Sequence, residues 1–188
     1  MPINIIPFNM PEPAEIPAHI ISNLQEMDPS QAVQRGMELL IQIEAAETIL
    51  YEQVDASGQL AWGAAVSQQT DKTDQLKNGL EPSYTQPLDK TQNSLARQAL
   101  TQRSALLVMG QVSADESPTI PQALLEFLLN GVASGNIGFN YVLPLIASNQ
   151  TPLGALTLIR PGDSGPLNHE QPNLTEALRQ IIVGILSA

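Results

Sequence analysis

The alternation of apolar and polar residues fails most clearly in the stretch between residues 139 and 160. Two nearly continuous apolar runs, "YVLPLIA" and "LGALTLI", are joined there by the turn sequence "SNQTP". An antiparallel strand with one solvated face alternates apolar and polar side chains, whereas a strand covered on both faces does not. We therefore predict that strands at 139–147 and 153–160 form a hairpin in the centre of a sheet that is covered on both faces.

Apolar residues at helical spacing predict the layer on one face of this sheet. The pattern indicates helices at 18–27, 29–43 and 172–186. Asp28 and Pro29 supply an N-cap and a first-turn proline for the second of them. We expect the helices at 29–43 and 172–186 to cover one face together.

Shorter segments complete the pattern. "ETILYEQV" and "QLAWGAAVS" are strand-like and flank the turn "DASG", so they predict a second hairpin, and "ALLVM" at 105–109 predicts a short buried strand. Residues 68–91 are expected to form a long polar loop, with helices at 92–102 and from about 121 to 130. The loop and these short helices would lie over the other face. The fold class is therefore α+β, an α/β sandwich around a central antiparallel sheet of five or six strands.

The N-terminal segment differs in composition from the rest of the chain. Residues 1–17 contain five prolines, which fix the backbone and lack an amide donor. We predict an extended proline-rich arm at 1–17 and a single domain at 18–188.

Charge and residue usage exclude several classes of function. The net charge of −11, from 19 acidic and 8 basic residues, repels nucleic acid and anionic membranes, so we expect neither as a partner. Cysteine is absent, and there are only two histidines, which argues against a metal site or a His-based triad. No basic region precedes an apolar stretch and no run is long enough to span a bilayer, so we expect a cytoplasmic protein.

Three segments, in order, resemble the GAF family of regulatory sensor domains. "NSLARQALTQRSALLV" resembles a family segment in which a helix, a tight turn and a strand follow one another. "YVLPLIASNQTPLGALTLIR" resembles the family's central hairpin, and "LNHEQPNLTEALRQII" resembles its closing helix. The resemblance covers roughly residues 20–187. It implies a GAF/PAS-like sheet and a regulatory role.

The resemblance does not identify a ligand. Some members of the family attach a bilin to a cysteine, which this chain lacks, so a covalently Cys-linked bilin is excluded. The Asn-Lys-x-Phe-Asp-Glu signature of members that bind cyclic nucleotides is also missing. The cofactor is therefore unknown.

Five residues are candidates for a pocket between the sheet and the 68–137 segments. Aromatic side chains commonly form the walls of small-molecule sites, and arginine binds anionic groups in a bidentate manner. The candidates are Trp62, Arg97, Phe127, Phe139 and Tyr141. For each of them the alternative is an ordinary role in the core or, for arginine, on the surface.

The closing helix is apolar over more of its circumference than contact with one sheet requires. We therefore expect a homodimer and take Ile21, Leu24, Ile182 and Leu186 as interface candidates. The alternative is that the 18–27 helix covers this surface within the chain.

Two functions remain open from the sequence. One is a regulatory domain that senses a small molecule in signal transduction, and the other is a ligand-free module for dimerisation or protein docking. No acid, base and nucleophile set is present, so we expect no catalytic residues and no enzyme activity.

Overall fold

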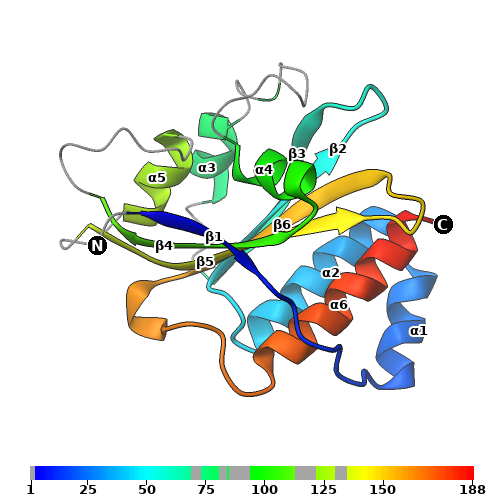
Figure 1. Cartoon of the computed structure of the whole chain (residues 1–188). Coiled ribbons are helices and arrows are strands. Elements are labelled where there is room, and N and C mark those ends of the chain that lie inside the picture. Colours follow the sequence, from blue (N-terminus) through cyan, green and yellow to red (C-terminus); the bar gives the residue numbers. More distant parts are fainter. Residues whose placement is uncertain (1–2, 69–72, 81–83, 85–93, 113–121, 130–134) are drawn as a thin grey trace.

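A single sheet of six antiparallel strands forms the centre of the computed structural model, which describes residues 3–68, 73–80, 84, 94–112, 122–129 and 135–188. The strand order is β1-β4-β5-β6-β2-β3 (Figure 1). The strands are β1 (Asn4–Phe8), β2 (Thr48–Val54), β3 (Leu60–Ser67), β4 (Ala105–Gln111), β5 (Asn136–Ile146) and β6 (Pro152–Arg160). The predicted central hairpin is β5 and β6, and no residue of either strand is exposed. The α+β fold and the place of this hairpin are confirmed.

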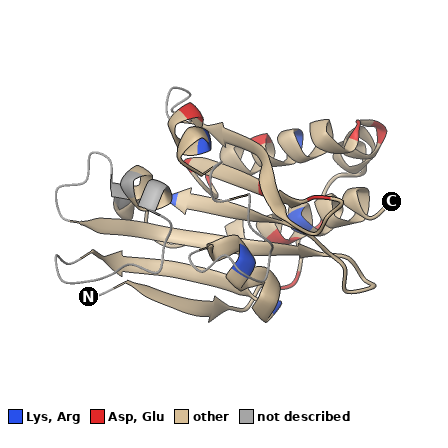
Figure 2. Cartoon of the chain, turned by 90° about the horizontal axis from the view of Figure 1, so that it is seen from above, with Lys and Arg blue, Asp and Glu red and all other residues tan. Residues whose placement is uncertain are grey.

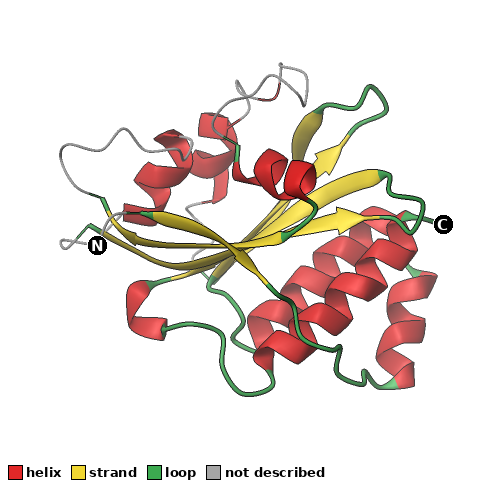
Figure 3. Cartoon of the chain, in the orientation of Figure 1, coloured by secondary structure: helices red, strands yellow, loops and turns green. Residues whose placement is uncertain are grey.

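Three helices lie on one side of the sheet, the two longer ones against the sheet and the shortest against one of these two (Figure 3). They are α1 (Ala18–Glu26), α2 (Pro29–Gln42) and α6 (Gln171–Leu186). Their apolar stripes meet the sheet in one core cluster, to which Met37, Leu40 and Ile182 contribute fully buried side chains. Helices α2 and α6 lie so close together that a Cβ atom on Gly36 would be 2.8 Å from Cδ1 of Ile182.

Three short helices, α3 (Thr73–Leu80), α4 (Leu95–Gln102) and α5 (Gln122–Leu129), cover the opposite face and form a second core cluster with it. The prediction of a continuous polar loop at 68–91 is wrong for residues 73–80, because α3 lies there; the rest of that segment, apart from residues 68 and 84, is outside the described residues. Leu76 and Leu80 are the only apolar residues of α3, and both are buried. The segment is helical because its two leucines, four residues apart, lie on one face of the helix and pack against the core. The polar composition of the segment does not reveal this contact.

The proline-rich N-terminal segment contributes a strand. Residues Asn4 to Phe8 pair with β4 in antiparallel register, from Asn4 opposite Met109 to Phe8 opposite Ala105. Pro7 is compatible with this position because β1 is an edge strand, where a missing amide hydrogen does not interrupt a ladder on the outer side.

Arg160, at the end of β6, ties three parts of the chain together. Its guanidinium donates to the carbonyl oxygens of Glu44 and Ala45, before β2, at 2.6 and 2.8 Å. It also donates to the carbonyl of Gly165 at 3.0 Å and to those of the residues before and after it, at the end of the 3-10 helix η3 (Gly162–Ser164) and just beyond it. Burial lowers the pKa of this guanidinium. The charge therefore serves the fold, because backbone dipoles surround it.

Candidate functional site

Charged residues are rare in the sheet. Among the six described strands only Glu52 of β2 and Arg160 of β6 carry a charged side chain, and the strands are otherwise uncharged in Figure 2. Both side chains are buried, with 8% and 4% of their surface exposed. Arg160 is accounted for by its carbonyl partners. Glu52 is therefore the buried charge that the fold itself does not explain.

Strand register places Glu52 beneath the short helices. Its Cα partners are Trp62 on β3 and Ala155 on β6, and paired residues point to the same face of a sheet. Trp62 and Ala155 both belong to the cluster formed with α3, α4 and α5. A bulge in the β2–β3 ladder, where Gly63 is the extra residue, sets this pairing. Glu52 thus lies between an indole and a small alanine side chain.

The environment of Glu52 favours its neutral form. Burial raises its pKa from 4.5 to about 7, and a hydrogen bond with the Tyr84 side chain partly opposes this rise. A carboxyl group with a pKa near neutrality can gain or lose its proton when a small change occurs beside it. A ligand that presents a positive charge or a hydrogen-bond donor would stabilise the ionised form.

A second buried polar group lies on the same face of the sheet. The Asn140 side-chain amide donates to the carbonyls of Val108 and Ile137 at 3.3 and 2.8 Å. Its Oδ1 atom is buried and accepts no hydrogen bond from the part of the chain that the structure describes. Unpaired buried acceptors are rare, because desolvation without a partner costs about 1–3 kcal/mol. The layer between the sheet and the short helices therefore holds polar groups at two places.

The structure separates the five residues predicted to surround one pocket. Trp62 and Phe127 are partly buried against the cluster below α3, α4 and α5, where the pocket was expected. Arg97 lies on α4 in the same layer, half-buried, and its backbone amide donates to the Ser94 hydroxyl as part of the helix cap. These three share the layer with Glu52. Whether any of them binds a ligand stays a prediction.

Phe139 and Tyr141 lie on the other face, so the expectation of one pocket for all five residues is wrong. Tyr141 is buried in the cluster with α1, α2 and α6, and its ring meets the Phe8 ring edge-on at 5.0 Å. Its hydroxyl accepts a hydrogen bond from the Leu167 amide at 3.1 Å. The physical reason is that β5 is apolar on both faces, so its sequence does not fix which alternate residues point to which layer.

Two of the four residues predicted for a dimer interface are interior. Leu24 and Ile182 have no exposed surface, and Ile182 packs against Gly36 of α2. The broad apolar arc of α6 is therefore covered largely within the chain, by α2. Ile21 and Leu186 are partly exposed and stay candidates.

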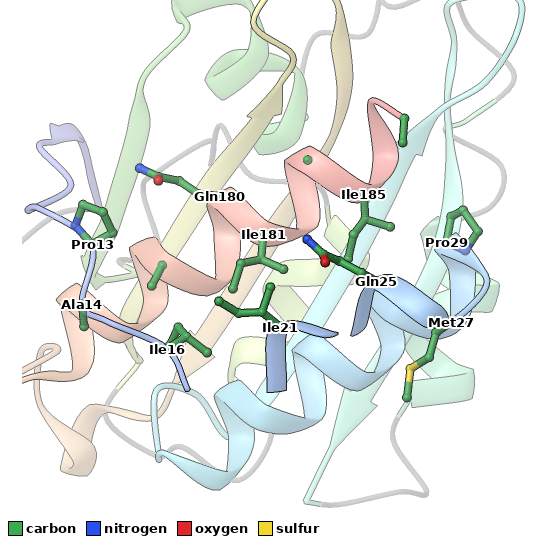
Figure 4. Close-up of a pocket in the computed structure, with 13 residues that line it drawn as sticks. Pro13, Ala14, Ile16, Ile21, Gln25, Met27, Pro29, Gln180, Ile181 and Ile185 are labelled. Carbon is green, nitrogen blue, oxygen red and sulfur yellow. The ribbon is translucent and has the colours of Figure 1, made fainter. Parts of the chain in front are cut away.

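An apolar groove remains between the N-terminal segment, α1 and α6. Figure 4 shows Ile16 and Ile21 on one side of it and Ile181 and Ile185 on the other. Its volume is about 690 Å³, and none of the residues that line it is charged. An uncharged groove of this size is notable in a chain with a net charge of −11, and it is separate from the layer around Glu52.

Glu52 was missed at the level of sequence, although a signal for it exists. In "TILYEQV" the residues two before and two after it, Leu50 and Val54, are apolar. With a period of two, Glu52 therefore shares a face with both of them. A glutamate in the middle of an apolar strand face, rather than at its end, indicates a buried carboxyl.

Several kinds of site are not found in the described part of the chain. No group of three or more His, Cys, Asp or Glu residues is placed there to hold a metal ion. None of the helices in the described ranges is both long and apolar enough to cross a membrane. Since the sequence has no cysteine, a bilin cannot be attached through a thioether.

This architecture is shared with solved structures of other proteins. No family model matches the sequence, and no curated protein matches it. The GAF domain/HD domain protein from Geobacter sulfurreducens has a similar structure, with a TM-score of 0.62 and 15% identity over 89% of this chain and 95% of that chain. Residues 122 to 287 of a methyl-accepting chemotaxis protein give a TM-score of 0.61 and 16% identity over 89% and 94%. The resemblance seen in the sequence is confirmed in three dimensions: this chain has the fold of a GAF domain.

Proposed function

We propose that the chain is a regulatory domain that senses a small molecule in signal transduction and has no catalytic activity of its own. The ligand binds in the layer between the sheet and α3, α4 and α5, beside Glu52 and Trp62. The observation that carries this proposal is the buried carboxyl of Glu52, whose pKa is raised to about 7. The fold shared with a GAF/HD protein and a chemotaxis protein supports a regulatory role.

The chemistry of Glu52 narrows the ligand. A buried carboxylate next to an indole suits an amine or another cation, because the carboxylate supplies charge and the ring supplies a cation–π contact. Such a ligand favours the ionised carboxylate, so its affinity rises with pH until Glu52 is ionised in the free protein. An anionic ligand would show the opposite trend.

Thermal-shift screening with amines, amino acids, nucleotides and tetrapyrroles tests the proposal, together with a native mass spectrum for molecules that copurify. We expect a stabilising ligand whose affinity falls about tenfold or more in Glu52→Gln and in Trp62→Leu, equivalent to one lost charge-assisted contact. Tyr141→Phe, on the other face, is the control and leaves the affinity unchanged. A ligand that ignores both substitutions, or no stabilisation by any class, contradicts the proposal.

The second candidate function is a dimerisation module. The observation that favours it is the uncharged groove lined by Ile21, Ile181 and Ile185. Closing such a surface against its own copy across a two-fold axis is the commonest arrangement in homo-oligomers. In this case the groove, rather than Leu24 and Ile182, forms the interface.

Light scattering at micromolar concentration distinguishes the two states, since the monomer has a mass of 20.2 kDa. If the groove is the interface, Ile181→Glu and Ile185→Glu convert a dimer to a monomer. Gln42→Glu introduces the same charge at an exposed position of α2 and serves as the control. A wild-type monomer, or a dimer that tolerates both glutamates, rules this interface out.

A further inference from the structure

Tyr51 is a buried tyrosine whose hydroxyl the fold does not use. It follows Leu50 on β2 and lies on the opposite face of the sheet from Glu52, in the cluster with α1, α2 and α6. Only 6% of its surface is exposed. In the part of the chain that the structure describes, no group forms a hydrogen bond with its hydroxyl, and the oxygen is not fully enclosed. A buried tyrosine hydroxyl usually has a partner, so this one points to a group from outside the chain.

Two glycines hold the tyrosine ring in place. A Cβ atom on Gly63 of β3 would be 2.7 Å from Cε1 of Tyr51, and one on Gly154 of β6 would be 3.0 Å from Cε2. The ring therefore lies against the two strands that flank β2, at positions that carry no side chain. Burial raises the pKa of the hydroxyl, so it is protonated at neutral pH and can donate. Tyr51 thus places a hydrogen-bond donor at a fixed point.

Tyr51 lines a cavity of about 720 Å³ between α2 and the strands β2 and β3. Val33 of α2 and Ala64 of β3 give this cavity an apolar interior. The volume is within the range of small-molecule sites and can hold a molecule of the size of a mono- or disaccharide. The cavity lies on the other face of the sheet from the layer around Glu52.

The outer wall of the cavity is polar but has no net charge. Gln31 and Gln34 of α2 and Gln53 of β2 are exposed there, and each amide both donates and accepts hydrogen bonds. Arg35 and Glu38 also lie on this wall, and they pair with each other at 3.2 Å, so that their charges cancel. A ligand with several hydroxyl groups matches such a wall, because a hydroxyl also both donates and accepts.

Charge and stacking argue against other classes of ligand. The net charge of −11 repels an anion, and a cation would find the carboxylate of Glu38 already paired. A nucleobase needs the face of an aromatic ring for stacking. Tyr51 is the only described aromatic residue that lines the cavity, and it is too deeply buried to offer a ring face. An uncharged polyhydroxylated molecule is therefore the class that fits.

We propose that the cavity between α2 and the strands β2 and β3 binds an uncharged saccharide. The Tyr51 hydroxyl donates to one oxygen atom of the sugar, and the amides of Gln31, Gln34 and Gln53 bind its other hydroxyl groups. Its carbon-bound hydrogens lie against Val33 and Ala64. The site is independent of the ligand proposed beside Glu52 and gives the domain a second input on the opposite face of the sheet.

Saturation-transfer NMR of the wild-type protein tests the proposal with glucose, galactose, mannose, maltose and cellobiose as probes. We expect at least one of these neutral sugars to bind with a Kd below about 10 mM. The 6-phosphate of the monosaccharide that binds most tightly should bind about tenfold more weakly at low salt, and the difference should shrink at high salt. The proposal is overturned if no neutral probe binds in this range, or if the phosphate binds more tightly than the neutral sugar.

Two phenylalanine substitutions locate the site. Tyr51→Phe should weaken sugar binding about tenfold, because the sugar loses its buried donor. It should keep the melting temperature within about 2 °C of wild type, since no hydrogen bond within the described chain is lost. Tyr141→Phe is the matched control: its hydroxyl has a partner within the chain, so sugar binding should be unchanged.

A second matched pair tests the polar wall. Gln34→Ala removes an amide at the cavity and should weaken binding about threefold or more, whereas Gln42→Ala, at an exposed position of α2 outside the cavity, should change it less than about twofold. Wild-type affinity in Tyr51→Phe would leave the hydroxyl to solvent and overturn the proposal. Equal affinities of Gln34→Ala and Gln42→Ala, or a loss in Tyr141→Phe as large as in Tyr51→Phe, would place the sugar elsewhere and also overturn it.

Discussion

Replacing Glu52 by glutamine should make the protein more stable at alkaline pH. The pKa of Glu52 is about 7 in the folded protein and 4.5 ordinarily, so the unfolded chain ionises first as pH rises. Between these two values each pH unit costs the folded state about 1.4 kcal/mol, and above pH 7 the total is on the order of 3 kcal/mol. Stability due to neutral Glu52 is fully present below pH 4.5 and lost as pH rises through about 7. Glutamine has nearly the same shape and never ionises, so it avoids this loss.

Urea denaturation of wild type and Glu52→Gln between pH 5.5 and 8.5 measures the effect. The difference in unfolding free energy should grow by about 2 kcal/mol in favour of the variant across this range and then level off. Other carboxylates are the same in both proteins and cancel in the difference. Glu26→Gln, at an exposed position of α1, is the control and should show no such growth. A difference that does not change with pH, or a variant that is less stable than wild type at pH 8.5, would refute the assignment of Glu52 as a buried carboxyl with a raised pKa.

Four further substitutions test the packing. Gly138→Ala should lower the unfolding free energy by more than about 3 kcal/mol in urea denaturation, because φ is +75° and the new Cβ would overlap the carbonyl of Arg160. Gly165→Ala is the comparison: φ is +68° there, but the new Cβ would lie in open space, so the substitution should cost about 1 kcal/mol. Tyr141→Phe should lose about 1 kcal/mol, the value of one hydrogen bond, and equal stability would show that its hydroxyl contributes nothing. Arg160→Lys should cost at least about 2 kcal/mol, because an ammonium cannot reach carbonyls on both sides as the guanidinium does, and a melting temperature equal to wild type would contradict this.

The sequence predicted those parts of the fold that depend on period and continuity. The unbroken apolar runs around Pro144 and Leu156 required cover on both faces, and β5 and β6 have it. The same unbroken apolar runs do not show which face of the sheet each side chain lies on. A strand that is apolar on both faces therefore does not reveal that Tyr141 and Asn140 point to opposite layers. Helix α3 was not predicted because it is stabilised by the packing of its two leucines against residues far away in the sequence.

The position of the candidate site is set by strand pairing and not by a sequence motif. Glu52 meets Trp62 because Gly63 is an extra residue in the ladder, and a bulge of this kind has no signal beyond a single glycine. The interior position of Ile182 likewise depends on Gly36, whose missing side chain allows α2 to approach α6. Glycines that permit close contact between elements thus decided where several predicted residues lie.

The N-terminal segment has a mechanical consequence. Beyond β1 it crosses to the opposite end of the sequence, where the Ala14 amide donates to the Asn173 carbonyl at 3.0 Å and the Asn173 side chain donates to the Glu12 carbonyl at 2.9 Å. Ahead of these two hydrogen bonds, at the end of β1, the ring of Phe8 rests on Tyr141. A tensile load on the first residues would therefore be shared between the β1–β4 ladder, the contact of Phe8 with Tyr141 and the first turn of α6. Conversely, a displacement of α6 along its axis would pull on the N-terminal segment and, through the pairing of β1, on β4.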